Sequence, residues 1–163
     1  MDVLGITHTV FAVLSLLLGP AVFFRRKGDR THRRIGYAYV GSMLALNATA
    51  FMIYDLFGRW GPFHYAAVAS SATLAMGLLP AMLRRPRGRW IGLHYAGMCW
   101  SYAGLGAAAV AETFTRLPGA WPALAASAPM TFFWAATAVG SALVMVIAVY
   151  LIRIRRVGYP QRT

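Results

Sequence analysis

The sequence predicts an all-helical integral membrane protein with five transmembrane helices, and three observations support this fold class. Hydrophobic residues make up 59% of the 163-residue chain and charged residues 12%, about half the charged share of a typical soluble domain. Five apolar runs are each close to the roughly 20 residues that a helix needs to cross a bilayer. The charges gather in short basic clusters between these runs, and no alternating pattern of polar and apolar residues indicates strands.

The expected spans follow one another within a single transmembrane domain, 1–163. The first begins after Asp2 and lacks the basic leading region of a cleavable signal peptide, so we expect it to be retained. The short connections 58–64 and 84–90 favour antiparallel packing of the helices that they join. A proline-containing segment, 113–129, separates the last span from the others, which predicts a four-helix bundle core with a peripheral fifth helix. The predicted spans are about 3–24, 37–57, 65–83, 91–112 and 130–152.

Prolines and small residues refine the expected packing of these spans. Pro20 and Pro80 lie inside spans, where each leaves the carbonyl four residues earlier, at Leu16 and Met76, without its helical partner. Such kinks are common in membrane helices. The fourth span is rich in Gly and Ala, which allow membrane helices to approach closely, so we expect it to lie inside the bundle.

The basic clusters predict the orientation of the chain. Fourteen of the sixteen Lys and Arg residues lie in 25–36, in 84–90 or after residue 152, whereas Arg59 and Arg116 lie in the other two connections. Because Lys and Arg concentrate in cytoplasmic loops, we expect a multi-pass protein of a bacterial inner membrane with its N-terminus outside and its C-terminus inside. The net charge of +12 then indicates contact with anionic lipids at the cytoplasmic face, and no nucleic-acid partner is expected.

Ionisable side chains in or near the spans are the candidates for chemistry, because they are costly in a bilayer and tend to face the bundle interior. The predicted topology places two histidines and two carboxylates near the outer surface and two histidines near the inner surface. The outer group is His8, Asp55, His64 and Glu112, and the inner group is His32 and His94.

The matched depths of the histidines favour a haem protein. Imidazoles from facing helices can ligate the iron of a haem from both sides. An inner pair, His32 with His94, and an outer pair, His8 with His64, would provide two haem b sites. The leading hypothesis is therefore a small redox or electron-transfer module, acting with a redox partner or as a homo-oligomer.

Two other functional classes remain open, and the sequence does not establish whether the chain is an enzyme. A membrane metalloenzyme is the first, because histidine and carboxylate ligands suit zinc or non-haem iron. A non-catalytic membrane subunit or a transporter is the second. The metal ligands of the first alternative would be His8, Asp55, His64 and Glu112.

The same residues also have purely structural interpretations. Asp29 and His32 could cap the second helix, and His64 could be an interfacial residue beside an aromatic cluster. The carboxylates could form ordinary ion pairs with residues four positions on, Asp55 with Arg59 and Glu112 with Arg116. The single cysteine, Cys99, excludes an intrachain disulfide.

Several stretches resemble a bacterial family of predicted membrane proteins. They are His8, Leu17-Leu18-Gly19-Pro20, the His-Arg-Arg-x-Gly-Tyr motif at 32–37, Phe63-His64, Gly77, and the His-x-x-x-Met-x-x-Ser-Tyr motif at 94–102 with Arg116 beyond it. These pieces resemble the family filed as domain of unknown function 2306 over roughly the first four spans. The resemblance implies a fold and a topology, because the family has no agreed activity to carry over.

Overall fold

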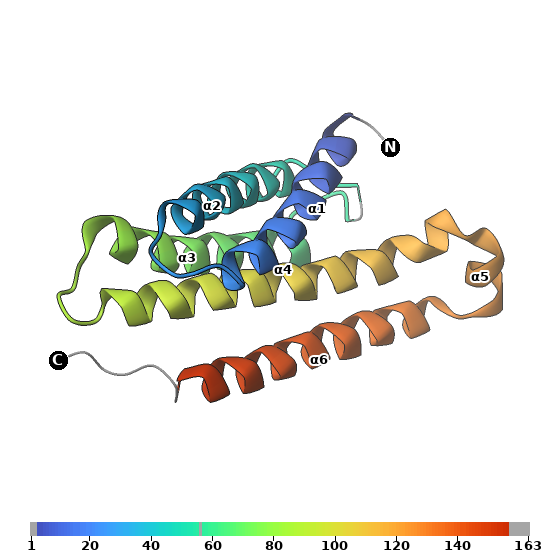
Figure 1. Ribbon diagram of the computed structural model, residues 1–163. Coiled ribbons are helices and arrows are strands. Elements are labelled where there is room, and N and C mark those ends of the chain that lie inside the picture. The colour runs from blue at the N-terminus through green and yellow to red at the C-terminus, as the bar shows by residue number, and fades with distance from the viewer. Residues whose placement is uncertain (1–2, 56, 157–163) are drawn as a thin grey trace. The chain divides into compact units, whose positions relative to one another are not determined.

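The computed structural model describes residues 3–55 and 57–156, and every regular element in these ranges is an α-helix. The elements are α1 (Val3–Phe23), α2 (Arg30–Ala50), α3 (Pro62–Leu83), α4 (Trp90–Ala120), the short α5 (Pro122–Ser127) and α6 (Met130–Arg156) (Figure 1). The predicted all-helical class is therefore confirmed for the part of the chain that the structure describes.

The chain divides into two compact units, and the boundary between them falls inside α4. The first unit, 1–102, contains α1, α2, α3 and the first part of α4. The second unit, 103–163, contains the rest of α4 together with α5 and α6. A single transmembrane domain with a four-helix core stays a prediction.

Helix α2 is the central helix of the first unit. It packs along α1 and against α3, and the α1–α2 pair is visible in Figure 1. Its buried face contains both apolar and polar side chains, and the polar ones bond to other helices, which satisfies groups that would be costly if left unpaired. The bonds are Ser42–Ser15 (2.8 Å), Tyr39–Ser101 (3.0 Å) and Asn47–Ser71 (3.1 Å). Asn47 thus joins α2 to α3 through its side-chain amide.

Helix α2 begins earlier than the sequence predicted. The span was expected at 37–57, whereas the helix covers Arg30–Ala50. The reason is the N-cap residue Asp29, whose carboxylate accepts a hydrogen bond from the backbone N–H of His32 at 2.6 Å. The basic residues at 30–34 therefore form the first turn of the helix instead of a loop, and Asp55 lies in the connection that follows α2.

Glycines bring α3 and α4 together within the first unit. A Cβ atom built on Gly97 would collide with the backbone N and Cα atoms of Gly77. A Cβ atom on Gly77 would lie 2.8 Å from the backbone N of Met98 and 2.7 Å from its sulfur. Contacts this short leave no room for a side chain, which agrees with the close approach predicted for the fourth helix. The Met98 side chain therefore packs against Gly77.

Tyr102 compensates for the proline that interrupts α1. Its hydroxyl donates a hydrogen bond to the carbonyl of Leu16 at 3.2 Å. This is the carbonyl that Pro20 was predicted to leave without a helical partner. The Tyr102 ring reaches it across Gly19, where a Cβ atom would overlap the ring.

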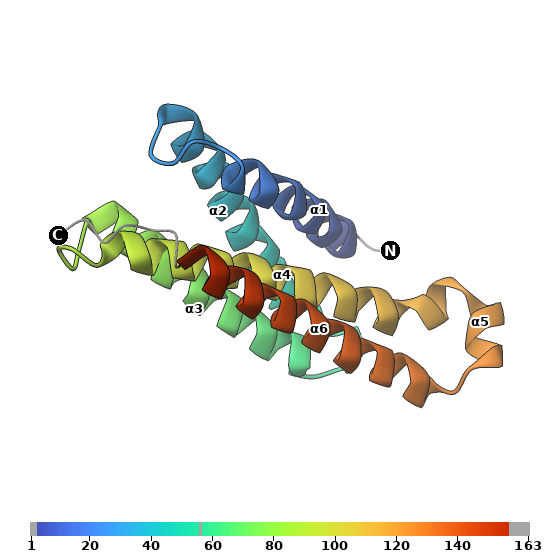
Figure 2. The ribbon, with the colours of Figure 1, turned by 60° about the horizontal axis from the view of Figure 1, so that its bottom comes forward.

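The second unit pairs the later part of α4 with α6, which lie side by side in both views (Figures 1 and 2). The Ser141 hydroxyl of α6 donates a hydrogen bond to the Ala107 carbonyl of α4 at 3.1 Å. Glycines again mark the contact, because a Cβ atom on Gly140 would lie 2.7 Å from a methyl group of Val110.

The proline-containing segment 113–129, which was expected only to connect the last two spans, is largely helical. Helix α4 continues to Ala120 instead of ending at residue 112, and α5 occupies Pro122–Ser127. Pro118 lies in the last turn of α4 and Pro122 at the first position of α5. Proline is tolerated at the first position of a helix, because the N–H that it lacks would have no partner there. The prolines therefore shape the helix ends and do not prevent helices.

Three helices are long and apolar enough to cross a membrane by length and composition: Val3–Phe23, Pro62–Leu83 and Met130–Ile154. Their apolar side chains are mostly exposed, and none is buried in the most apolar window of the third. Helix α2 opens with arginines and is the least apolar of the long helices, and neither α2 nor α4 is among these three. The count of five spans and their orientation stay predictions.

Candidate functional site

Two histidines lie together in the first unit, where α2 and α4 begin. The ring centroids of His32 and His94 are 6.4 Å apart, and the ring planes are inclined by 85°. Two imidazole nitrogens bound to one metal from opposite sides, at about 2.0–2.1 Å each, place their ring centroids roughly 6–6.5 Å apart. The structure thus brings the predicted inner pair to a separation that one bridging metal atom would require.

The His94 ring is oriented by α3. Its Nδ1 atom lies 2.8 Å from the carbonyl oxygen of Gly77. A carbonyl can only accept a hydrogen bond, so in the neutral ring Nδ1 carries the proton and Nε2 carries the lone pair. Metal-binding histidines typically donate their second ring N–H to such an acceptor, which fixes the tautomer and the ring orientation. His94 therefore has the tautomer that a ligand at Nε2 needs.

The His32 ring is partly buried in a basic environment. Its Nδ1 atom is buried and has no hydrogen-bond partner among the described residues. Burial lowers the pKa of His32, and the charge of Lys27 and the nearby His94 lower it further, whereas a hydrogen bond to the backbone of Val22 and the charge of Asp29 raise it. The neutral imidazole, which is the form that ligates a metal, is therefore favoured.

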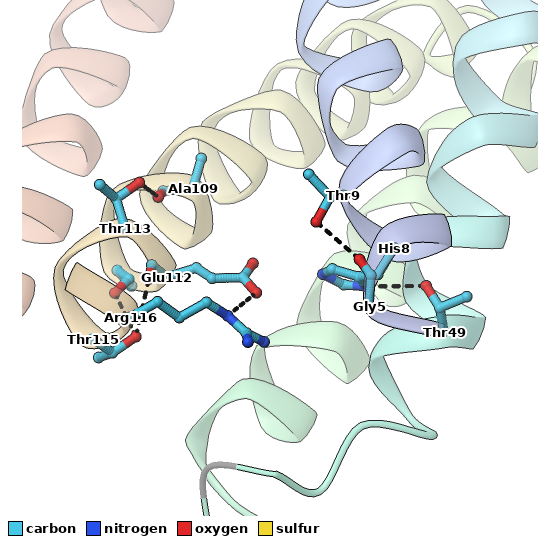
Figure 3. Close-up of polar contacts among 10 residues, drawn as sticks. Gly5, His8, Thr9, Thr49, Ala109, Glu112, Thr113, Thr115 and Arg116 are labelled. Carbon is cyan, nitrogen blue, oxygen red and sulfur yellow. Dashed lines mark hydrogen bonds and ion pairs between the residues drawn. The ribbon is translucent and has the colours of Figure 1, made fainter. Parts of the chain in front are cut away.

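His8 is held by α2 in a similar way to His94. Its Nδ1 atom lies 3.0 Å from the hydroxyl oxygen of Thr49 (Figure 3). The single hydrogen of that hydroxyl goes to a backbone carbonyl of its own helix, since those of Ala45 and Leu46 lie at 3.0 and 2.8 Å, so its oxygen accepts the Nδ1–H of His8. The lone pair of the His8 ring is then on Nε2, as in His94.

His64 has the opposite tautomer. It lies in the first turn of α3, with 3% of its surface exposed. Its Nδ1 atom accepts the backbone N–H of Gly61 at 3.1 Å, so the proton of the neutral ring is on Nε2. The rings of Trp60 and Tyr54 lie against it, with centroids at 4.8 and 4.7 Å. A metal at Nε2 would require this N–H proton to leave and the bond from Gly61 to break.

The two carboxylates have different surroundings. Glu112 accepts a hydrogen bond from the guanidinium of Arg116, with Oε1 and Nε 2.8 Å apart (Figure 3), so this predicted i,i+4 ion pair is confirmed. No ion pair joins Asp55 to Arg59, although the structure describes both. Glu112 belongs to the second unit, and Asp55 to the first.

The proposed four-ligand metal site receives no support from the geometry. Across residues 3–55 and 57–156, no group of three or more His, Cys, Asp or Glu side chains is placed to hold a metal ion. The alternative site of His8, Asp55, His64 and Glu112 therefore rests on the sequence alone.

Sequence reasoning missed the groups that orient the histidines. The Gly77 carbonyl, the Thr49 hydroxyl and the Gly61 N–H are each contributed by a residue with no recognisable chemical signature. Thr49 is 41 positions from His8, and Gly77 is 17 positions from His94, so only the packing of helices reveals either partner.

Three of the helices expose apolar side chains, and buried hydrogen bonds join helices to one another. These features define an all-helical membrane protein. The family model described as "Predicted membrane protein (DUF2306)" matches residues 5–154, and the chain belongs to this family. The match covers the fifth predicted span as well as the first four. No curated protein and no solved structure matches the chain.

Proposed function

We propose that this protein is a small redox module of a bacterial inner membrane that binds haem b between His32 and His94. The observation that carries the proposal is the pair of rings 6.4 Å apart, with the Nδ1 of His94 on the Gly77 carbonyl. A bound haem would supply one-electron chemistry, and its two histidine ligands would tune its reduction potential.

The surroundings of the pair also support haem binding. The propionate groups of haem are carboxylates, and arginine binds carboxylates through two parallel hydrogen bonds. Arg33 and Arg34 adjoin His32 on α2 and are exposed. The lowered pKa of His32 keeps its ring neutral at physiological pH. These features favour the inner pair over the outer pair, because the Nε2 of His64 carries a proton that ligation would have to displace.

The membrane arrangement is part of the proposal. Five crossings with the N-terminus outside would place 25–36, 84–90 and the C-terminal tail in the cytoplasm. Anionic lipids are the partners proposed for these basic segments. The histidine pair, at the start of α2, would then lie at the cytoplasmic side of the bilayer.

An absorbance spectrum of the detergent-purified protein, expressed with a supply of haem, tests the proposal. We expect a Soret band and, after reduction with dithionite, sharp α and β bands of low-spin haem. His94→Ala and His32→Ala should each abolish the low-spin spectrum, whereas His64→Ala should leave it in place. A wild-type protein without a Soret band would overturn the proposal. Elemental analysis would then test for zinc or non-haem iron. A protein with neither metal would favour a non-catalytic subunit or a transporter.

A further inference from the structure

The Nε2–H of His64 is a buried hydrogen-bond donor without an acceptor in the described part of the chain. The side chain is 3% exposed, and its Nε2 atom has no hydrogen-bond partner. The other ring nitrogen accepts the Gly61 N–H at 3.1 Å, so the donor cannot be removed by a change of tautomer. Buried donors in native proteins nearly always have a partner, so this N–H calls for an acceptor that the described residues do not supply.

Aromatic rings lie against the His64 ring. Trp60 is nearly parallel to His64, with an angle of 28° between the planes, and Phe51 extends the stack beyond Trp60 at a centroid distance of 5.9 Å and an angle of 25°. Tyr54 lies against His64 with an angle of 36°. A single N–H donor in such surroundings suits a neutral acceptor oxygen and disfavours a cation, which the donor would repel.

We infer that His64 is the docking point for the carbonyl oxygen of a ligand dissolved in the membrane. Two abundant membrane molecules carry such an oxygen: a quinone, on its planar ring, and a phospholipid, in its acyl ester. The quinone is the occupant that the aromatic cluster of Phe51, Tyr54, Trp60 and His64 fits better, because Tyr54 and Trp60 are partly exposed and aromatic side chains bind planar rings by stacked or edge-to-face contact. The inference does not depend on the haem proposal, because binding at His64 requires no haem.

Fluorescence titration tests the inference. The full-length protein in lipid nanodiscs is titrated with a short-chain 1,4-naphthoquinone, and quenching of tryptophan emission is recorded. We expect a saturable component of the quenching, which Trp60→Phe removes. A short-chain diacyl phosphatidylglycerol is the second probe: prevention of quinone quenching by this lipid at equal concentration would assign the site to the ester.

Variants of the donor give the decisive comparison. His64→Phe keeps an aromatic ring and removes the N–H, and should weaken quinone binding at least tenfold. His64→Gln keeps a donor near the position of Nε2 and should bind within about threefold of wild type. Tyr65→Phe is the matched control, because it removes a hydroxyl from an exposed ring beside Trp60 and should leave affinity unchanged. Equal affinity of wild type and His64→Phe for the quinone, or the absence of a saturable component in the quinone quenching, would overturn the inference and leave water as the partner of the N–H.

Discussion

At the scale of single residues, hydrogen bonds to the backbone and to hydroxyl groups sort the histidines into two kinds. His94 and His8 donate through Nδ1, to Gly77 and Thr49, and present a lone pair at Nε2. His64 accepts at Nδ1 and presents an N–H at Nε2. The first kind suits a metal and the second suits an acceptor oxygen.

Nitrogen NMR checks these tautomers directly. In haem-free protein labelled with ¹⁵N-histidine, we expect the Nδ1–H form for His94 and His8 and the Nε2–H form for His64. Single substitutions of each histidine assign the signals, since the chain contains only four. An Nε2–H form of His94 would contradict the geometry and remove the support for its role as a ligand.

The lowered pKa of His32 predicts a dependence of stability on pH. The pKa of histidine in an unfolded chain is about 6.5. As the pH falls through this value, the unfolded chain binds a proton that the folded chain resists, so the free energy of unfolding decreases. Stability is therefore fully retained above about pH 7 and is lost on acidification. Thermal unfolding of haem-free wild type and of His32→Gln, measured from pH 7.5 to 5, should show the steeper loss in wild type. Parallel curves would contradict the assignment.

At the scale of elements, the structure shows how polar helices fit into the first unit. Helix α2 is less apolar than α1 or α3, and its buried polar groups bond to side chains of α1, α3 and α4. Sequence patterns predicted that the long helices exist, because each of them contains a run of apolar residues that can be recognised without knowledge of its contacts. The patterns misplaced the ends of α2 and α4. The start of α2 was missed because the cap residue Asp29 extends the helix into basic residues. The end of α4 was missed because Pro118, near the helix end, does not break the helix.

The glycine contact between α3 and α4 gives a prediction for this scale. Gly97→Ala should destabilise the protein by about 1–3 kcal/mol, because the new methyl group would overlap the backbone of Gly77 and push the helices apart. Gly92→Ala is the control in the same helix, where a Cβ atom meets nothing within 4 Å, and should change stability by less than about 1 kcal/mol. Unfolding in a graded mixture of detergents measures both. The Gly97 variant should also weaken haem binding, since His94 reaches Gly77 across this contact.

At the scale of the whole molecule, the prediction from sequence reached the class and the family. Composition and the positions of basic residues required no knowledge of contacts, so they predicted a helical membrane protein. The site was harder to predict. The pairing of His32 with His94 followed from matched depth, but the groups that fix each tautomer come from other helices and have no periodic signature.

The topology can be tested by labelling single cysteines in intact spheroplasts. In a Cys99→Ala background, a membrane-impermeant maleimide should label Arg59→Cys and Ala126→Cys from the outside. Thr31→Cys and Arg87→Cys should react only after the membrane is permeabilised. All four positions are exposed in the structure, so accessibility alone does not separate them. Labelling of residue 31 in intact spheroplasts would contradict the proposed orientation.

The hydrogen bond from Tyr102 to Leu16 also has a consequence for biosynthesis. Helix α1 is made before α4, and the partner tyrosine lies 86 residues after Leu16 in the chain. At about 5–20 residues per second, the ribosome needs roughly 4–17 s to reach it. During this interval the Leu16 carbonyl lacks both the N–H that Pro20 cannot supply and the tyrosine hydroxyl. The arrival of the fourth helix completes the first one, and this bond distinguishes a fully assembled chain from one whose translation stopped early.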